Sequence, residues 1–111
     1  ALENYLKDGE PCSASRSGTW ECSAAGSKLK EAGTDHWSAT GGTNTSGFTA
    51  LGAGRRSTDS SFSYLGAHAF FWSSSQSGAS AWRRSLGSSY ATVSRDLGAK
   101  ALGFSVRCLK D

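Results

Sequence analysis

The sequence predicts a single α+β domain with a small twisted antiparallel sheet, one or two short helices and long ordered loops. Its 111 residues suit one domain and leave no room for a second. In the last third, apolar and polar residues alternate in short segments separated by Ser and Gly, which is typical of antiparallel strands with one buried face. Only 37% of the residues are hydrophobic, but 4 Trp, 5 Phe and 3 Tyr can supply a small core.

Two short helices are expected before the strands. Apolar residues at i, i+3 and i+4 predict a helix over residues 1–7, which Gly9 and Pro11 end. A second short helical segment is expected over residues 23–31, with Gly33 after it.

Two polar stretches, 33–47 and most of 49–61, are rich in Gly, Ser and Thr and are expected to be irregular. Loops of this length are uncommon unless they are functional or disordered. Because apolar residues are interleaved with them, we expect ordered loops pinned by side chains. These anchors are Trp37, Phe48, Leu51 and Phe62.

Four short strands are expected towards the C-terminus, over residues 69–73, 81–86, 90–94 and 104–109. Within the second, Arg84 shares a face with Trp82 and Leu86, so its aliphatic stem is expected to be buried. Arg83 and Ser85 are expected to face solvent. There Arg83 is either a contact for an acidic or carbohydrate ligand or an ordinary surface residue.

Aromatic residues of the expected strands predict part of the core. Trp72 and Trp82 are expected there because large aromatic side chains dominate burial in small domains. In the last strand Phe104, Val106 and Cys108 are expected to share one face.

The three cysteines predict one disulfide. Cys12 and Cys22 flank a polar segment that cannot order itself, which favours a bridge over two free thiols of a reducing compartment. Cys108 is left over, which indicates a missing partner or a reactive thiol. No metal site is expected, because neither His36 nor His68 lies at ligand spacing and no Cys-x-x-Cys occurs.

The net charge of +3 is small and is not concentrated in a run. The doublets Arg55-Arg56 and Arg83-Arg84 are expected to be ordinary solvated charges, so a nucleic-acid surface is not expected. No apolar stretch is long enough to cross a bilayer, so direct membrane insertion is not expected.

Signals for catalysis and cofactors are poor, so an enzyme is not expected. No Gly-x-Ser-x-Gly elbow and no phosphate-binding glycine fingerprint occur. His68 is expected to be hydrogen-bonded or exposed rather than catalytic. Arg107 is expected to pair with Asp59 or Asp96.

Several segments together resemble the Fibrobacter succinogenes major paralogous domain, over nearly the whole chain. The most distinctive are 47–51, 70–75, 81–86 and 103–111. The resemblance implies a C-type-lectin-like fold related to formylglycine-generating enzymes. The family's usual Cys-Pro-x-Gly-Trp-x-x-Pro start is absent, so the chain is expected to lack the family's N-terminal segment. The resemblance implies that the family's C-terminal cysteine pairs with the cysteine of that segment, so Cys108 is expected either to lack its partner or to find it in another chain or fragment.

The resemblance also implies a function, because several members are variable proteins diversified by retroelements. A fixed scaffold would carry a changeable ligand surface in the C-terminal third of a secreted or cell-surface protein, with a protein or carbohydrate ligand on a cell surface. The positions expected to contact ligand are Gln76, Ser77, Arg83, Ser85, Gly87, Ser88, Tyr90, Asp96, Leu97 and Leu102.

Two alternatives remain open at this point, and so does the oligomeric state. One is a structural module of a surface fibre or adhesin. The other is a relative of formylglycine-generating enzymes, although no cysteine pair of this chain matches the reactive pair of those enzymes.

Overall fold

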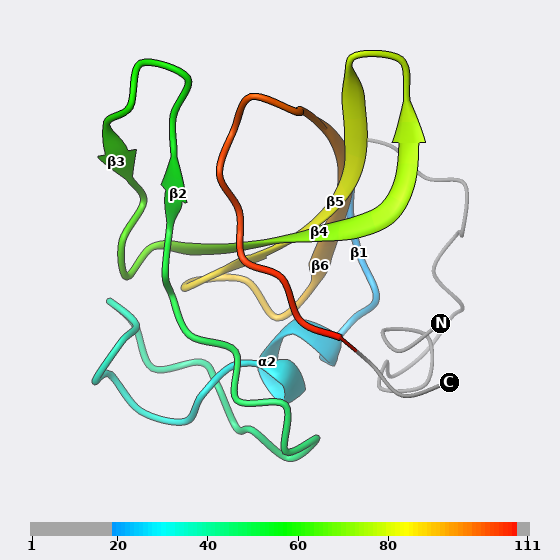
Figure 1. Ribbon diagram of the computed structural model, residues 1–111. Helices are drawn as coiled ribbons and strands as arrows, with labels where there is room; N and C mark the ends of the chain where they lie inside the picture. Colours follow the sequence, from blue (N-terminus) through cyan, green and yellow to red (C-terminus); the bar gives the residue numbers. More distant parts are fainter. Residues whose placement is uncertain (1–18, 109–111) are drawn as a thin grey trace.

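Antiparallel sheet makes up most of the regular structure in residues 19–108, the part of the chain that the computed structural model describes (Figure 1). The elements are β1 (Thr19–Glu21), α2 (Ala25–Leu29), β2 (Arg55–Arg56), β3 (Phe62–Ser63), β4 (His68–Ser77), β5 (Ser80–Gly87) and β6 (Val93–Ala99). One sheet has four strands in the order β1-β6-β5-β4, and β2 and β3 form a second sheet. The expected helix over residues 1–7 lies outside the described residues.

The long β4–β5 hairpin is the largest part of the sheet. Its pairing extends to Ser77↔Ser80, with a register shift between Trp72 and Gln76. Gly78 begins the turn with φ +59°, a backbone conformation that glycine adopts without a steric cost. The strands expected over 69–73 and 81–86 are therefore confirmed, and both are longer than expected.

The third expected strand, over 90–94, is displaced along the chain, because β6 begins only at Val93. A buried lysine accounts for the shift. Lys30 is 1% exposed, and its ammonium donates hydrogen bonds to the carbonyl oxygens of Gly87, Ser88 and Tyr90 at 2.8, 3.2 and 2.8 Å. These bonds hold the chain in a turn where the sequence predicted a strand.

The expected strand over 104–109 is wrong for its described part. The segment 103–105 makes single bridges to both sheets, Arg56↔Gly103 and Phe71↔Ser105. In Figure 1 this segment runs beside β2 and crosses β4. Beyond it Val106 is 72% exposed and Cys108 is exposed, so the expected buried face is absent here.

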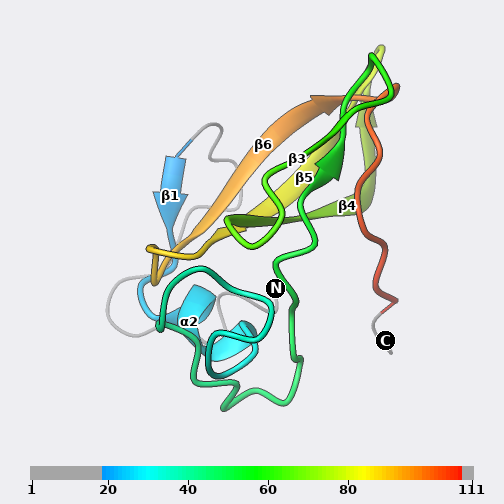
Figure 2. The same cartoon turned by 90° about the vertical axis from the view of Figure 1, so that its left-hand side faces the viewer.

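The hydrophobic core lies on one face of the four-stranded sheet, which we call the core face. Ala69, Leu86 and Val93 come from three neighbouring strands and are all at most 2% exposed. The other core members are Cys22, Ala25, Leu29, Trp37 and Ala50. Helix α2 and the loops after it supply these residues and lie below the sheet in both ribbon views (Figures 1 and 2). Gly26 permits the close approach, since a Cβ there would lie 2.3 Å from the Thr92 carbonyl oxygen.

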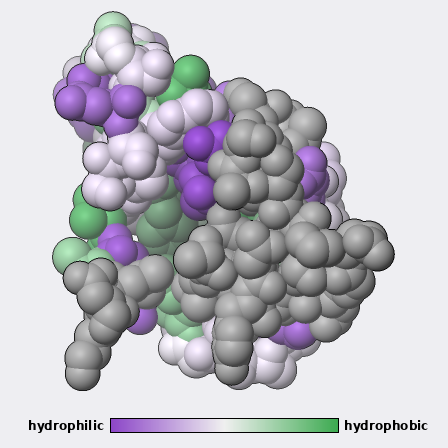
Figure 3. Space-filling view, turned by 90° about the vertical axis from the view of Figure 1, so that its right-hand side faces the viewer, coloured by the Kyte–Doolittle hydropathy of each residue, from purple (hydrophilic) through white to green (hydrophobic). Residues whose placement is uncertain are grey.

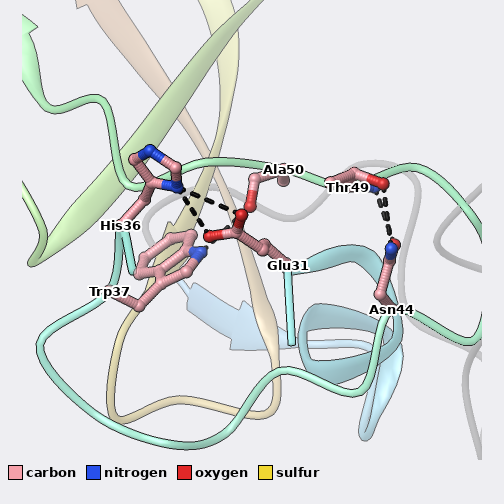
Figure 4. Close-up of polar contacts among 6 residues, drawn as sticks. All are labelled: Glu31, His36, Trp37, Asn44, Thr49 and Ala50. Atoms are coloured by element: carbon pink, nitrogen blue, oxygen red, sulfur yellow. Dashed lines mark hydrogen bonds and ion pairs between the residues drawn. The ribbon is translucent and has the colours of Figure 1, made fainter. Parts of the chain in front are cut away.

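The long loops are pinned by specific polar contacts (Figure 4). The Trp37 indole N–H donates to the Ala50 carbonyl oxygen at 2.9 Å. Asn44 donates to the Thr49 hydroxyl at 2.9 Å and accepts from the Thr49 N–H at 2.8 Å. The ordered character of these loops thus depends on hydrogen bonds as well as on apolar anchors.

Two of the four expected loop anchors pack as expected. Trp37 is in the core, and Phe48 packs against it. Leu51 and Phe62 are 40% and 81% exposed, so their expected role is wrong. Phe62 instead belongs to β3, which pairs with β2 of the stretch 49–61 that was expected to be irregular.

Other expected positions also need correction. Trp72 and Trp82 are half-buried on opposite faces of the sheet, and neither belongs to the core cluster. The Arg107 guanidinium, expected to pair with an aspartate, lies 4.4 Å from the centre of the Phe48 ring and donates to the Phe48 carbonyl oxygen at 2.9 Å.

On the side seen in Figure 3, apolar surface is divided into separate small areas among the described atoms. No helix of residues 19–108 is long and apolar enough to span a bilayer. Cys12 lies outside the described residues, so its bridge to Cys22 stays a prediction.

Candidate functional site

A pocket of about 250 Å³ opens on the face of the four-stranded sheet opposite the core. We call this face the pocket face and the recess the arginine pocket. Its lining residues are Trp20, Arg55, Tyr64, His68, Phe70, Arg83, Ser85, Ser94 and Asp96.

Strand alternation brings the side chains of the pocket floor together. Phe70 of β4 lies opposite Ser85 of β5, which lies opposite Ser94 of β6. Arg83 and Asp96 form the next pair along β5 and β6, on the same face. Three neighbouring strands therefore supply one continuous polar and aromatic floor.

Arg83 lies against two aromatic rings that stack on each other, Phe70 and Phe104, whose centroids are 5.2 Å apart. Its guanidinium carbon lies 5.1 Å from the centre of the Phe70 ring and 5.3 Å from that of Phe104. Its side chain is only 17% exposed. Burial lowers the pKa of the Arg83 guanidinium, and the charge of Asp96 opposes that effect. An arginine remains charged in proteins, so a desolvated cation lies in the pocket.

The nearest acidic group leaves Arg83 incompletely paired. Its Nη2 atom lies 3.8 Å from Asp96 Oδ2, beyond hydrogen-bond distance. Its Nε and Nη1 atoms are buried and have no hydrogen-bond partner within residues 19–108. An unsatisfied buried donor costs about 1–3 kcal/mol, and charged groups cost more. Such atoms in a pocket indicate a place where a ligand or water supplies the acceptor.

Arg55 brings a second cation into the pocket from β2. Its guanidinium carbon lies 5.0 Å from the centre of the Tyr64 ring and 5.8 Å from that of Phe70. Its Nε atom is also buried and unpaired in the described part of the chain. Phe70 therefore contacts both guanidinium groups, and the rings fix the positions of both cations.

His68, at the start of β4, also lines the arginine pocket. Burial, and then the charge of Arg83, lower the pKa of the His68 imidazole from 6.5, so the ring is neutral at neutral pH. Its ring packs against those of Tyr64 and Phe70, with centroids 5.1 and 5.7 Å away. Its Nδ1 atom is buried with no hydrogen-bond partner among the described residues, while the residue as a whole is half-buried. That His68 is not catalytic stays a prediction.

Each arginine doublet of the sequence is divided between the pocket and another surface. Arg56 is exposed and donates to the Ser60 hydroxyl at 2.7 Å, outside the pocket lining. Arg84 lies on the core face and donates to the Arg83 carbonyl oxygen at 3.4 Å. The doublets were expected to be solvated charges, and that is wrong for Arg55 and Arg83, which are half-buried.

Three residues of the expected ligand surface meet in the arginine pocket: Arg83, Ser85 and Asp96. They do so as part of its wall rather than as solvent-facing positions, since Ser85 is 4% exposed. The expected division of β5 into two faces is confirmed, but the expected solvent exposure of the Arg83 face is wrong, because Arg55, Tyr64 and Phe104 cover it.

The other expected positions lie elsewhere. Tyr90 stacks on Trp20 with ring centroids 4.5 Å apart at the edge of the pocket, and buried Gly87 touches the Tyr90 ring. The remaining five positions are Gln76 and Ser77 at the hairpin end, Ser88 in the lysine-held turn, Leu97 on the core face and Leu102 after β6. Their contact with ligand stays a prediction.

Sequence reasoning missed six residues of the pocket lining: Trp20, Arg55, Tyr64, His68, Phe70 and Ser94. A signal existed for His68 and Phe70, because residues two apart in a strand such as β4 lie on the same face. Arg55 carried no such signal, because it lies in the stretch 49–61 that was expected to be irregular. Tyr64 lies in a segment for which no strand was predicted. Among residues 19–108, no three His, Cys, Asp or Glu side chains come together as metal ligands would.

The fold and the pocket define a small β-rich domain with a cationic recess lined by aromatic rings. The chain belongs to the Fibrobacter succinogenes major domain family, whose model matches residues 1–110. No curated protein and no solved structure matches the chain.

Proposed function

We propose that this domain is a ligand-binding module of a secreted or cell-surface protein, with the arginine pocket as its binding site. The observation that carries the proposal is the set of buried, unpaired N–H groups of Arg55 and Arg83, which have no acceptor within residues 19–108. The proposal does not include catalysis.

The residues around the two arginines of the pocket favour binding of a compact polar ligand. Aromatic rings give rigid contact area, while serine hydroxyls give adaptable hydrogen bonding. The pocket combines Trp20 and Tyr64 with Ser85 and Ser94. A ligand there would gain partners for the arginines and a ring surface for packing.

The proposal extends to the finer fold and to its biology. A C-type-lectin-like scaffold and diversification by a retroelement are proposed on the resemblance alone. A near-copy of the C-terminal coding segment beside a reverse transcriptase gene would support diversification. A neighbourhood without either would contradict it.

The binding function is tested with the full chain on a glycan array and by calorimetry. We expect saturable binding to at least one saccharide. Binding should fall at least about 10-fold in Arg83→Gln and stay unchanged in Arg84→Gln, which removes the neighbouring charge from the other face. Equal losses in both variants, or no binding to any surface polysaccharide or protein extract at high micromolar protein, would contradict it.

A structural module of a fibre is the second candidate. Phe62 and Leu65 are 81% and 83% exposed on β3 and the turn after it, and such residues can form contacts between copies. This candidate predicts concentration-dependent sedimentation that Phe62→Ser abolishes. A monomer at every concentration would exclude it.

A further inference from the structure

The charges that line the arginine pocket do not balance. Arg55 and Arg83 contribute two cations, Asp96 contributes one carboxylate, and His68 is neutral at neutral pH. Asp96 is also partly engaged, since its Oδ1 accepts a hydrogen bond from the Leu97 N–H at 2.8 Å. The pocket therefore has a net positive charge that an anionic group would neutralise.

The geometry favours a planar anion over a neutral ligand. A guanidinium presents its N–H groups in a fixed plane, of which a carboxylate accepts two in parallel. Arg83 packs against Phe70 and Phe104, and Arg55 lies over Tyr64, so aromatic contacts hold both guanidinium groups in place before a ligand arrives. Prior ordering of these long side chains lowers the entropy lost on binding.

The rest of the lining favours a sugar as the carrier of that anion. Sugar hydroxyls need both donors and acceptors, and Ser85, Ser94 and Asp96 offer them beside the arginines. Trp20 and Tyr64 offer ring faces at the open side, with Tyr64 46% exposed. A small inorganic anion would use the guanidinium groups alone and leave this second half of the pocket unused.

We infer that the arginine pocket binds the carboxylate of an acidic saccharide residue, such as a uronic acid. The inference rests on the proposed binding function and narrows it to one ligand class. The carboxylate would accept from Arg83 and Arg55, and the ring hydroxyls would meet the serines and Asp96.

Calorimetry on the full chain at fixed ionic strength tests this inference. The probes are glucuronate, galacturonate, glucose, galactose, sodium sulfate and a peptide rich in Asp and Glu. We expect the uronates to bind at least about 10-fold more tightly than the neutral sugars. Sulfate and the acidic peptide should bind more weakly than the uronates.

Each pocket arginine has a neighbour in the sequence outside the pocket, which serves as its control. Arg83→Gln and Arg55→Gln should each weaken uronate binding at least about 10-fold, whereas Arg84→Gln and Arg56→Gln should not change it. Arg83→Lys should bind with intermediate affinity, because it keeps the charge and loses the planar fork. It also serves if Arg83→Gln fails to fold.

Each contrary result has a distinct meaning. Neutral sugars binding as tightly as uronates would overturn the acidic ligand and leave the saccharide-binding function standing. Tighter binding of sulfate or of the acidic peptide would overturn the sugar acid in favour of a simple anion or a protein ligand. No binding by any probe, together with a blank glycan array, would overturn both proposals.

Discussion

The two faces of the four-stranded sheet use the same strand alternation in opposite ways. On the core face, Ala69, Leu86 and Val93 pack against α2 and its loops and are almost completely buried. On the pocket face, Arg83 is less buried, with 17% of its side chain exposed, yet two of its nitrogen atoms are buried without a partner in the described residues. Burial on the first face stabilises the fold. On the second it keeps two cations available at a cost in stability.

The comparison predicts that adjacent β5 residues differ sharply in their contribution to stability. Leu86→Ala should lower the free energy of unfolding by about 3 kcal/mol, because it removes buried methyl groups and leaves a cavity. Ser85→Ala, on the pocket face, should change it by less than about 1 kcal/mol. Urea unfolding at pH 7 measures both. A larger loss for Ser85→Ala than for Leu86→Ala would contradict the assignment of the faces.

Lys30 tests how the turn between β5 and β6 is held. Lys30→Met should cost about 2 kcal/mol, because three carbonyl oxygens lose a charged donor while the removal of a buried charge offsets part of that loss. Lys28→Met removes a neighbouring lysine but leaves these three bonds in place, so it should cost less than Lys30→Met. If the two variants unfold at the same urea concentration, the three hydrogen bonds of Lys30 do not stabilise the turn.

The pocket face should also be the more sensitive to acid through His68. Its pKa in the folded protein is lowered from 6.5 by burial and by Arg83. Below about pH 6.5 the unfolded chain therefore binds more protons than the folded one, and stability falls as the pH falls, by at most about 1.4 kcal/mol per pH unit.

The difference between wild type and His68→Gln isolates this contribution. Unfolding free energies of both proteins between pH 5 and 8 should diverge as the pH rises from 5 towards 6.5 and then run parallel. Parallel curves throughout would show that the histidine titrates alike in both states. The carboxylates contribute equally to the two proteins and cancel.

Arg107 should give the smallest effect. Its exposed guanidinium lies over Phe48, which packs against the core. Arg107→Ala should lower the unfolding free energy by about 0.5 kcal/mol, the size of an exposed cation–π contact. A loss above about 2 kcal/mol would show that the C-terminal segment does more to stabilise the core than its exposure indicates.

Local patterns in the sequence were enough to predict the central hairpin and α2. Alternation identified 69–73 and 81–86 as strands, and Gly33 correctly lay beyond the helix, although α2 ends earlier, at Leu29. The expected strand over 104–109 failed because its alternation does not reflect pairing along a neighbour: the described part makes isolated bridges.

The pocket was harder to predict, because its cover comes from distant parts of the chain. Alternation correctly separated Arg83 from Arg84, but it cannot tell which face of a strand is covered. Tyr64, Arg55 and Phe104 come from two segments that reach β5 only through tertiary contacts. Gln76 and Ser77 show the opposite case: they were predicted to contact ligand, and they are exposed but do not line the pocket.

The most direct test of the account follows the side-chain Nε–Hε signals of the arginines by NMR in ¹⁵N-labelled full chain. On addition of glucuronate, the signals of Arg55 and Arg83 should shift saturably, while those of Arg56 and Arg84 stay in place; glucose should move neither pair. Equal movement of all four signals with either sugar, or none at saturating glucuronate, would contradict the claim that the pocket face holds its arginines for an acidic ligand.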